Sequence, residues 1–503
     1  MMAGFKQALV ALCVCITSAC QSNLQTRDAE AALVNPDHTG IRWGLVVAKM
    51  DGTELLTLRP DERFTPASNT KIITTLAGYH YLDQLEAEAV SPGTRVLIED
   101  NGANRPASLI LKGGGDAMLS DAPDCESYCL SFLAEQVAEF GVEKYDLIIG
   151  DDSWFPFERW GVGWSIEDLQ FYYGTAISAL SVNDNLVWIE IEPGASVGDP
   201  AQLKWRAGDT YLSLQNELIT AEAKAETDFG VERYPGTSNV RIYGHLAIES
   251  SPISFPLAIE NPAEFAAVRL RALLEARGIA VEGVETRHRA LTLSDIPPDS
   301  EGDLAPDAPP VLLEGKTKKN SPQVIAQLDE APLRETLRRI SKDSENMHAD
   351  LLLRRLGRLE GTGSRRYGVA KLEAFMAEAG ISKTSYALSG GSGMSVYNRI
   401  SPRAMVKLLA FAAQQAWFET WLADQPIGGV DGTLERRFVG TRLQGRIFAK
   451  TGTLNGANAL SGVMIAKSGQ RVLFSIIAND RPAITSSATP EMDALLNLIA
   501  ETY

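Results

Sequence analysis

Three short polar motifs, far apart in the sequence but in a fixed order, constrain this chain more than any other feature. They are Ser68-Asn69-Thr70-Lys71, Ser344-Glu345-Asn346 and Lys450-Thr451-Gly452, the last of which is followed by Thr453. A serine and a lysine three positions apart on a helix lie on one face, and a buried lysine can lose its proton near neutral pH and act as the general base of the serine. Each motif is common by itself, but their order and context predict one active site with Ser68 as the nucleophile.

The two ends of the chain are predicted to contribute strands to one antiparallel sheet. Alternating and apolar runs, bounded by turn residues such as Asp51-Gly52, are typical of strands. These runs are Trp43 to Met50, Glu54 to Leu58, Arg446 to Lys450, Ala457 to Ala466 and Val472 to Ala478. Helices are expected from about Ser68 and from Pro490, because each opens an apolar stripe of helical period. We therefore expect an antiparallel sheet with the nucleophile helix beneath it.

The segment between Lys71 and Ser344 is far too long for a loop, so it must contain inserted domains. It holds many short strand-like runs, a helix from Pro262 to Arg277, and an acidic, proline-rich linker from Asp295 to Pro310. The strand-like runs include 108–112, 147–149, 186–191 and 240–248. The predicted fold class is α+β: an antiparallel sheet flanked by helices, interrupted by nested, mostly β inserted domains.

Composition excludes some classes of function. The 503 residues suffice for two or three domains. The formal net charge of -17 argues against a nucleic-acid partner, since no basic excess is left to neutralise phosphates. We interpret the acidity as a contribution to solubility. None of the five histidines lies in a His-Glu-x-x-His arrangement, so neither a metal site nor a cofactor is predicted.

Residues 1–19 are predicted to be a signal peptide. Lys6 precedes an apolar run, Ala8 to Ile16, that is too short to span a bilayer. The small residues before Cys20 resemble a bacterial lipoprotein box, although Thr17 stands where leucine is usual. Cys20 is therefore the expected site of lipidation, which would anchor the protein to a membrane surface. The alternative is cleavage after Ala19 and a soluble periplasmic protein.

Two cysteines, Cys125 and Cys129, belong to the body of the protein. In an oxidising compartment they could form a small local disulfide. The alternative is two free thiols, because a spacing of four residues on a regular helix is marginal for bridging.

Further stretches match a known family in the same order. They are Lys112 to Asp116, Gly150 to Ser153, Tyr172 to Gly174, Ser178 to Asn185, Ser392 to Ser395 and Gly429 to Leu434. With them the chain resembles the low-molecular-mass class C penicillin-binding proteins, which are D-alanyl-D-alanine carboxypeptidases/endopeptidases of the penicillin-binding protein 4 type. The resemblance implies a β-lactamase/transpeptidase-like catalytic domain at 27–92 plus 311–503. It also implies an inserted domain II at 93–180 plus 265–310, and a domain III at 181–264 nested within domain II.

The same resemblance implies roles for the motif residues. Ser68 is the nucleophile that forms the acyl-enzyme, and Lys71 is the base that accepts its proton. Ser344 and Lys450 complete the proton path to the leaving amine, and Asn346 holds the substrate amide. Taken alone, Ser344 would more simply be a helix N-cap.

Other residues are implied to bind the substrate. The backbone N–H groups of Ser68 and Thr453 form the oxyanion hole, and the Thr451-Gly452-Thr453 segment receives the terminal carboxylate through its two hydroxyls. Either Asp151 or Asp152 meets the amine of the stem-peptide diamino acid, although both could simply be loop residues.

One departure concerns substrate choice. Where the family has an arginine after Ser395, this chain has Val396. The cation expected to bind the side-chain carboxylate of diaminopimelate is therefore missing, unless a neighbour such as Arg399 replaces it.

These features predict an exported serine D,D-peptidase that removes terminal D-alanine from peptidoglycan stem peptides, cleaves D-alanyl cross-links, or does both. Its expected location is the periplasm, in soluble form or anchored to the outer membrane through Cys20, and β-lactam antibiotics are its expected inhibitors. The alternatives are a serine β-lactamase or D-amino-acid esterase of the same fold, or a catalytically silent cell-wall binding protein. A β-lactamase needs a positioned base for deacylation, and no dedicated glutamate motif is visible. The sequence makes no prediction of the oligomeric state.

Overall fold

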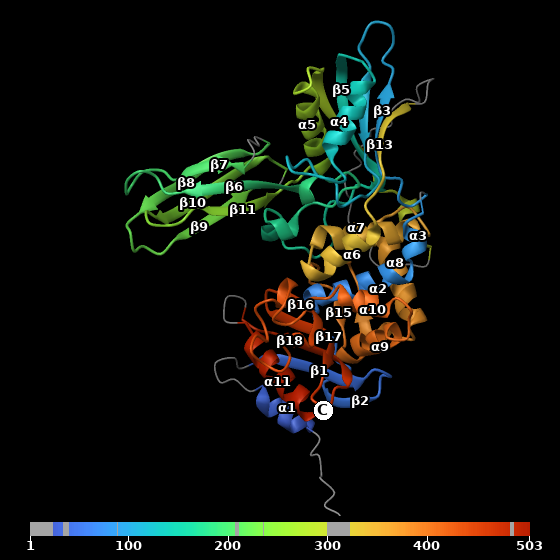
Figure 1. Cartoon of the computed structure of the whole chain (residues 1–503), viewed down its shortest axis with the longest axis vertical. Helices are drawn as coiled ribbons and strands as arrows, with labels where there is room; N and C mark the ends of the chain where they lie inside the picture. The colour runs from blue at the N-terminus through green and yellow to red at the C-terminus, as the bar shows by residue number, and fades with distance from the viewer. Residues whose placement is uncertain are drawn as a thin grey trace, which may run out of the picture.

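The computed structural model describes residues 24–33, 40–87, 89–206, 211–234, 236–298, 322–482 and 487–503. The molecule is elongated: the two ends of the chain form one body, and the middle of the sequence forms a second body with a projecting arm (Figure 1). We call these the catalytic body, the inserted body and the arm. The predicted signal peptide and Cys20 lie outside the described residues. Among the residues that are described, we find no helix with the length and apolar character that a membrane crossing requires.

The catalytic body contains a five-stranded antiparallel sheet in the order β16-β17-β18-β1-β2. Its strands are β1 (Arg42–Lys49), β2 (Glu54–Leu58), β16 (Ile447–Leu454), β17 (Ala457–Ile465) and β18 (Arg471–Asn479). The first strand of the chain pairs with the last, from Arg42 opposite Asn479 to Lys49 opposite Val472. All five predicted strands are confirmed, and β16 continues past Lys450 to Leu454.

Helices cover both faces of this sheet, as the burial of alternate residues shows. In β1, Leu45 and Val47 pack in a cluster with α11, whereas Val46 and Ala48 pack in another cluster with α2 and α9. Side chains alternate along a strand, so a strand that is apolar on both faces, as β1 is, can be buried between two layers of helices. The helices are α1 (Thr26–Ala32) and α11 (Thr489–Thr502) on one side, and α2 (Thr70–His80), α6 (Leu333–Lys342), α7 (Asn346–Arg358), α8 (Arg365–Glu378), α9 (Pro402–Ala412) and α10 (Phe418–Ala423) on the other.

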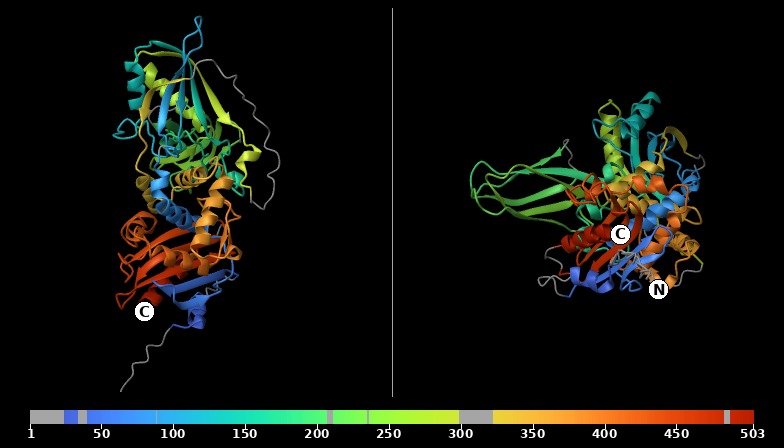
Figure 2. Two further views of the ribbon diagram at one scale, coloured as in Figure 1. Left: turned by 90° about the vertical axis from the view of Figure 1, so that its right-hand side faces the viewer. Right: turned by 60° about the horizontal axis from the view of Figure 1, so that its bottom comes forward.

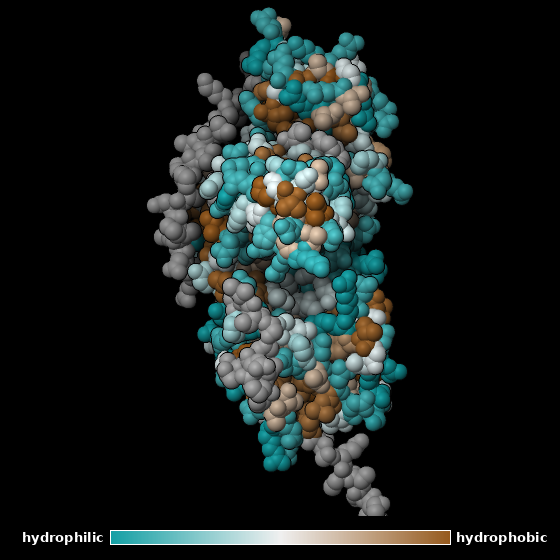
Figure 3. Space-filling view, turned by 90° about the vertical axis from the view of Figure 1, so that its left-hand side faces the viewer, coloured by the Kyte–Doolittle hydropathy of each residue, from teal (hydrophilic) through white to brown (hydrophobic). Residues whose placement is uncertain are grey.

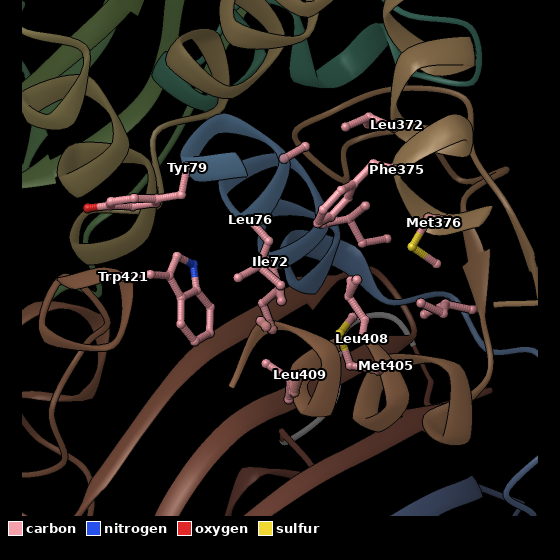
Figure 4. Close-up of a cluster of buried hydrophobic side chains, with 14 of the residues drawn as sticks. Ile72, Leu76, Tyr79, Leu372, Phe375, Met376, Met405, Leu408, Leu409 and Trp421 are labelled. Carbon is pink, nitrogen blue, oxygen red and sulfur yellow. The ribbon is translucent and has the colours of Figure 1, made fainter. Parts of the chain in front are cut away.

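Helix α2 lies inside the larger of these clusters. Every residue from Thr70 to Tyr79 is buried. Ile72 and Leu76 point among Phe375 of α8, Leu408 of α9 and the other apolar side chains that surround the helix (Figure 4). The predicted apolar stripe is thus confirmed, and the helix that follows Ser68 is held rigidly by packing on all sides.

The inserted body contains a second five-stranded sheet, in the order β12-β5-β4-β3-β13. The long strand β5 runs parallel to β4 and β12, and the helices α4 (Leu130–Glu139) and α5 (Pro262–Glu275) pack side by side against the sheet. The strands are β3 (Thr94–Glu99), β4 (Ser108–Lys112), β5 (Lys144–Pro156), β12 (Ala280–Arg289) and β13 (Gln323–Leu328).

The arm is built from two three-stranded sheets, ordered β11-β6-β7 and β8-β10-β9. Buried apolar residues such as Val187, Ile189 and Ile242 form its interior. Figure 3 looks at the free end of the arm, where apolar groups are ringed by hydrophilic ones. Its strands are β6 (Leu186–Glu192), β7 (Gln202–Trp205), β8 (Ser213–Ala221), β9 (Asp228–Arg233), β10 (Asn239–Ala247) and β11 (Ile253–Ala258).

Three short elements belong to the catalytic body and not to the arm. They are α3 (Leu82–Leu85), β14 (Tyr386–Ala387) and β15 (Arg399–Ile400).

One predicted domain boundary is wrong. Residues from 311 onward were assigned to the catalytic domain, but β13 pairs antiparallel with β3, from Gln323 opposite Ile98 to Leu328 opposite Thr94. This strand therefore belongs to the sheet of the inserted body, where the chain runs before it returns to the catalytic body (Figure 2). The physical reason is that β13 satisfies the backbone hydrogen bonds along the open edge of β3. The nested α+β architecture is confirmed, and the remaining predicted boundaries stay predictions.

Cys125 and Cys129 are joined by a disulfide, so the open alternative of two free thiols is wrong. The bridge is possible because the two residues are not on a regular helix. Tyr128 has a left-handed backbone (φ 55°), and Cys129 is the extended residue that precedes α4.

Candidate active site

Ser68 lies in a 3₁₀ turn, Ala67–Asn69, that leads directly into α2. Lys71, three residues later in the first turn of α2, points back so that its Nζ is 2.9 Å from Ser68 Oγ. Ser68 remains half-buried, whereas Lys71 is fully buried. The predicted nucleophile and base thus lie on one face, with the serine accessible and the lysine shielded from water.

Lys71 is held by two further oxygens. Its Nζ donates to Asn346 Oδ1 at 2.5 Å and to the backbone carbonyl of Ser392 at 2.6 Å. Burial lowers the pKa of Lys71 to about 7, against the opposing charges of Asp350 and Glu345. Near neutral pH a substantial fraction of this lysine is therefore neutral and able to accept a proton.

The second motif forms the tight connection between α6 and α7. Ser344 has a left-handed backbone (φ 66°), which is unfavourable for a residue with a side chain. Its Oγ accepts a hydrogen bond of 2.8 Å from Lys450 Nζ. The Asn346 side chain spans the site, because its Oδ1 accepts from Lys71 while its Nδ2 donates to the Tyr173 carbonyl at 2.8 Å.

Lys450 is the second buried lysine of the site. Burial lowers its pKa well below the ordinary value, and the neighbouring charge of Lys71 lowers it further. Two ammonium groups cannot both stay charged at low cost in a buried site. The pair can therefore hold and pass on a proton, which a proton path between Lys71, Ser344 and a leaving group requires.

The third motif lies on β16, the edge strand of the sheet. A side chain at Gly452 would place a Cβ 2.6 Å from the Pro66 carbonyl, so only glycine allows the strand to pass this close to the turn that carries Ser68. Asn69 Nδ2 fastens the two segments by donating to the Lys450 carbonyl at 2.8 Å. Thr451 Oγ1 donates to Thr433 Oγ1 at 2.8 Å, and Thr453 is exposed. Residues 426–428 cover the beginning of this edge, where the Ala449 N–H donates to the Pro426 carbonyl at 3.0 Å. Beyond Ala449 no strand of the described residues pairs with the edge, so its Thr451–Thr453 part is available to an extended peptide.

Sequence reasoning assigned no role to three groups that the structure places here. The carbonyls of Ser392 and Tyr173 bind Lys71 and Asn346, and the Asp350 carboxylate accepts from the Gly391 N–H at 2.9 Å. Ser392 and Tyr173 lie in stretches that the family resemblance had singled out, but a backbone carbonyl leaves no residue signature. Asp350 was detectable in principle, because it lies one helical turn after Asn346 on the same face.

The structure does not join Asp151 or Asp152 to this cluster. Both carboxylates are buried in the inserted body. Asp151 accepts from Ser153 and lies 3.5 Å from Arg287, whereas Asp152 accepts from Ser178 and contacts His288 at 2.7 Å. Their predicted role toward a diamino acid stays a prediction, because an incoming amine would have to compete with these partners.

Val396 is half-exposed on a loop beside the site, and its N–H donates to the Gly163 carbonyl at 3.0 Å. Arg399, the neighbour that could have replaced the missing arginine, is instead bound to backbone carbonyls. Its NH1 donates to the carbonyls of Val396 at 2.5 Å and Asn398 at 2.8 Å.

Among the described residues we also find no group of three or more histidine, cysteine, aspartate or glutamate side chains suited to a metal ion.

Comparison of the sequence with known proteins identifies one family. The model of the D-Ala-D-Ala carboxypeptidase 3 (S13) family matches residues 25–292 and 311–502. A D-alanyl-D-alanine carboxypeptidase from Actinomadura sp. (strain R39) is 30% identical over 474 residues, which cover 90% of this chain and 80% of that protein. The D-alanyl-D-alanine carboxypeptidase DacB from Haemophilus influenzae is 26% identical over 424 residues, covering 81% and 79% of the two chains.

A solved structure supports the fold. The crystal structure of penicillin binding protein 4 from Haemophilus influenzae has a TM-score of 0.76 and 20% sequence identity, and the match covers 95% of this chain and 98% of that one. The likeness extends over the catalytic body, the inserted body and the arm together. On the strength of a family model that matches nearly the whole described chain, this protein belongs to the D-Ala-D-Ala carboxypeptidase 3 (S13) family.

Proposed function

We propose that this chain is an exported serine D,D-peptidase of peptidoglycan, of the penicillin-binding protein 4 type, that works through a Ser68 acyl-enzyme. One observation carries the proposal: a buried lysine with a pKa of about 7 contacts the hydroxyl of a half-buried serine at 2.9 Å. That arrangement activates a nucleophile without a histidine or a metal ion. The names of the relatives, D-alanyl-D-alanine carboxypeptidases, support the same activity.

The acylation step follows from the contacts. Neutral Lys71 accepts the proton of Ser68 Oγ as this oxygen attacks the carbonyl of the penultimate D-alanine. The oxyanion that forms is bound by the backbone N–H groups of Ser68 and Thr453. When the peptide bond breaks, a proton reaches the leaving amine by way of Ser344 and Lys450, which are 2.8 Å apart. Water then hydrolyses the ester and frees Ser68.

The substrate-binding residues lie on the edge strand. Thr451, Gly452 and Thr453 of β16 would receive the terminal carboxylate, and Asn346 would hold the substrate amide. Lys71 and Lys450 share a proton, and the lysine that holds it carries a positive charge that attracts a carboxylate to this end of the site. The same features suit a β-lactam, whose strained amide and carboxylate imitate the peptide. Support for inhibition comes from the similar Haemophilus influenzae fold, which has been solved in complex with a β-lactam.

Mass spectrometry of peptidoglycan fragments tests the proposal directly. Purified pentapeptide monomers and cross-linked dimers would be incubated with the enzyme and analysed before and after. We expect loss of the terminal D-alanine from monomers, conversion of dimers to monomers, or both. Unchanged fragments, together with rapid turnover of penicillin, would favour the β-lactamase alternative.

We further propose that the protein is exported through residues 1–19 and retained at a membrane through a lipidated Cys20. Replacing Cys20 with alanine is expected to move the protein from the membrane fraction to the soluble periplasm, because the anchor is a covalent lipid and not a spanning helix. Cell fractionation followed by immunoblotting measures the shift, and penicillin labelling of the soluble form should be unchanged. An unmodified mature N-terminus in a wild-type protein that is already soluble would refute the anchor.

Val396 is expected to weaken discrimination between peptides with a free diaminopimelate carboxylate and amidated or lysine-containing peptides. Introducing the missing cation with Val396→Arg should raise kcat/KM for the free diaminopimelate peptide by at most about a hundredfold, since a charge-assisted pair contributes roughly 1.5–3 kcal/mol. Both peptides are assayed on both proteins. A wild type that is already strongly selective, with selectivity unchanged in the variant, would show that another residue binds the carboxylate.

A further inference from the structure

The inserted body reaches the Ser344 connection through a strained turn, Asn183-Asp184-Asn185. All three residues have left-handed backbones, with φ of 53°, 56° and 57°. Consecutive left-handed residues are rare because each Cβ crowds a carbonyl oxygen, and asparagine and aspartate are the side chains that tolerate it best. Such strain persists only where the surroundings hold it, and it often marks a functional role.

The two asparagines fasten this turn to the inserted body. Asn183 Oδ1 accepts from Ser120 Oγ and from the Asp121 N–H, both at 3.0 Å. Asn185 is fully buried, and its Nδ2 donates to the Ala176 carbonyl at 2.9 Å and to Ser181 Oγ at 3.0 Å. With both flanks fixed, the turn presents the side chain between them in one direction.

That side chain, Asp184, contacts both helices that flank Ser344. Arg339 of α6 donates to its two oxygens at 3.3 and 2.8 Å, and His348 Nε2 of α7 contacts Oδ1 at 2.7 Å. Burial by itself would raise the pKa of Asp184, but the hydrogen bond to His348 and the charges of His348 and Arg339 hold that pKa well below its usual range. The carboxylate therefore stays ionised and binds the two helices at once.

Ser344 lies between these two contacts. The end of α6 is also held from the opposite side, where Lys342 Nζ binds Asp431 at 2.5 Å and the Gln425 carbonyl at 2.7 Å. The segment that carries the left-handed Ser344 is thus held by the ion pairs of Asp184 and of Lys342, and in this backbone conformation its Oγ accepts from Lys450 Nζ.

We propose that Asp184 is a positioning residue for acylation: its carboxylate locks α6 against α7, so that Ser344 and Asn346 stay in contact with Lys450 and Lys71. The inference rests on the proposed function. Within the described residues, the hydrogen-bond and ion partners of Asp184 are Arg339 and His348, so it acts through the Ser344 connection and does not touch the reacting groups. The inserted body is thereby part of the machinery that aligns the active site.

Stopped-flow acylation with a fluorescent penicillin tests this role. In Asp184→Ala the limiting acylation rate constant is expected to fall about 10- to 100-fold, the scale of a small misplacement of catalytic groups. The half-saturating concentration should change little, because the carboxylate-binding residues are on β16, which Asp184 does not contact. Asp184→Asn, which keeps the size and one hydrogen bond, should show a smaller loss and remains available if the alanine variant does not fold.

The matched control is Asp146→Asn. Asp146 is also a buried carboxylate of the inserted body with an arginine partner, Arg105 at 2.6 Å, but its partners lie within the inserted body. Its variant should acylate at the wild-type rate. Arg339→Ala should lose part of the rate that Asp184→Ala loses, because the contact of His348 with Asp184 remains. The double variant should be no slower than Asp184→Ala alone, because the ion pair of Arg339 is already absent from that single variant.

The readout separates positioning from simple stability. Loss of folded protein lowers the fraction of molecules that become labelled, whereas misalignment lowers the rate constant of those that do. Asp184 variants that label a smaller fraction at the wild-type rate, or an Asp146→Asn variant that is equally slow, would overturn the inference. A wild type that is not acylated, or a Ser68→Ala variant that is, would overturn the proposed function and this inference with it.

Discussion

Ser68→Ala is expected to abolish covalent labelling by a fluorescent penicillin. The hydroxyl of Ser68 is the atom that bonds to the β-lactam carbonyl, and alanine offers no nucleophile in its place. The fold should be unaffected, because Ser68 is half-buried and α2 is held by the packing of the residues that follow it. Gel fluorescence measures the label, and circular dichroism verifies the fold.

A control serine makes the result specific. Ser468 lies in the exposed turn between β17 and β18, outside the three motifs. Ser468→Ala should label as strongly as the wild type. Equal labelling of Ser68→Ala and the wild type would show that the nucleophile is a different residue, and the whole assignment of the site would fail.

Lys71→Arg is expected to slow acylation by roughly 10²-fold or more. An arginine preserves the positive charge but cannot release its proton at a usable pH. The wild type supplies a second signature. Because burial lowers the pKa of Lys71 to about 7, its acylation rate should rise with pH through that value and level off above it, as the lysine becomes neutral. Stopped-flow rates across this pH range measure both effects.

Lys371 provides the matched control for this substitution. It is also a buried lysine, but it lies on α8 and pairs with Glu360 at 2.5 Å, a contact for which a permanent cation suffices. Lys371→Arg should therefore acylate at the wild-type rate with the same pH dependence. If Lys71→Arg retained near-normal acylation, or the pH-dependent rise persisted in it, some other group would be the base.

Much of the catalytic body could be predicted from the sequence, because its signals are local. The period of the apolar residues located the five strands of the first sheet and helix α2, and the Asp51-Gly52 turn placed the first hairpin. The predicted helix from Pro262 was confirmed for the same reason. β13 was assigned to the wrong domain because the domain of an edge strand depends on the strand with which it pairs. The sequence of residues 323–328 does not predict that this partner is β3.

The active site divides in the same way. The sequence by itself predicts the chemistry of the site, because side-chain chemistry and helical spacing are local properties. The residues that allow this prediction are those at positions 68, 71, 344, 346 and 450. The family resemblance and the activity it implies followed from these residues together with the further matching stretches, such as Lys112 to Asp116 and Ser178 to Asn185.

Only the tertiary structure decided how these residues meet. The carbonyls of Ser392 and Tyr173, which accept from Lys71 and Asn346, are backbone groups. Every residue has such a group, so the identity of a residue does not predict this role. The contact of Asp184 with α6 and α7 depends on a left-handed turn in one body and a helix pair in another. The low pKa of Lys71 arises from burial, and burial is set by packing across the whole body and not by the neighbours of a residue in sequence. The sequence by itself thus determined which chemistry is present, and the fold determined the distances and the dielectric surroundings at which that chemistry operates.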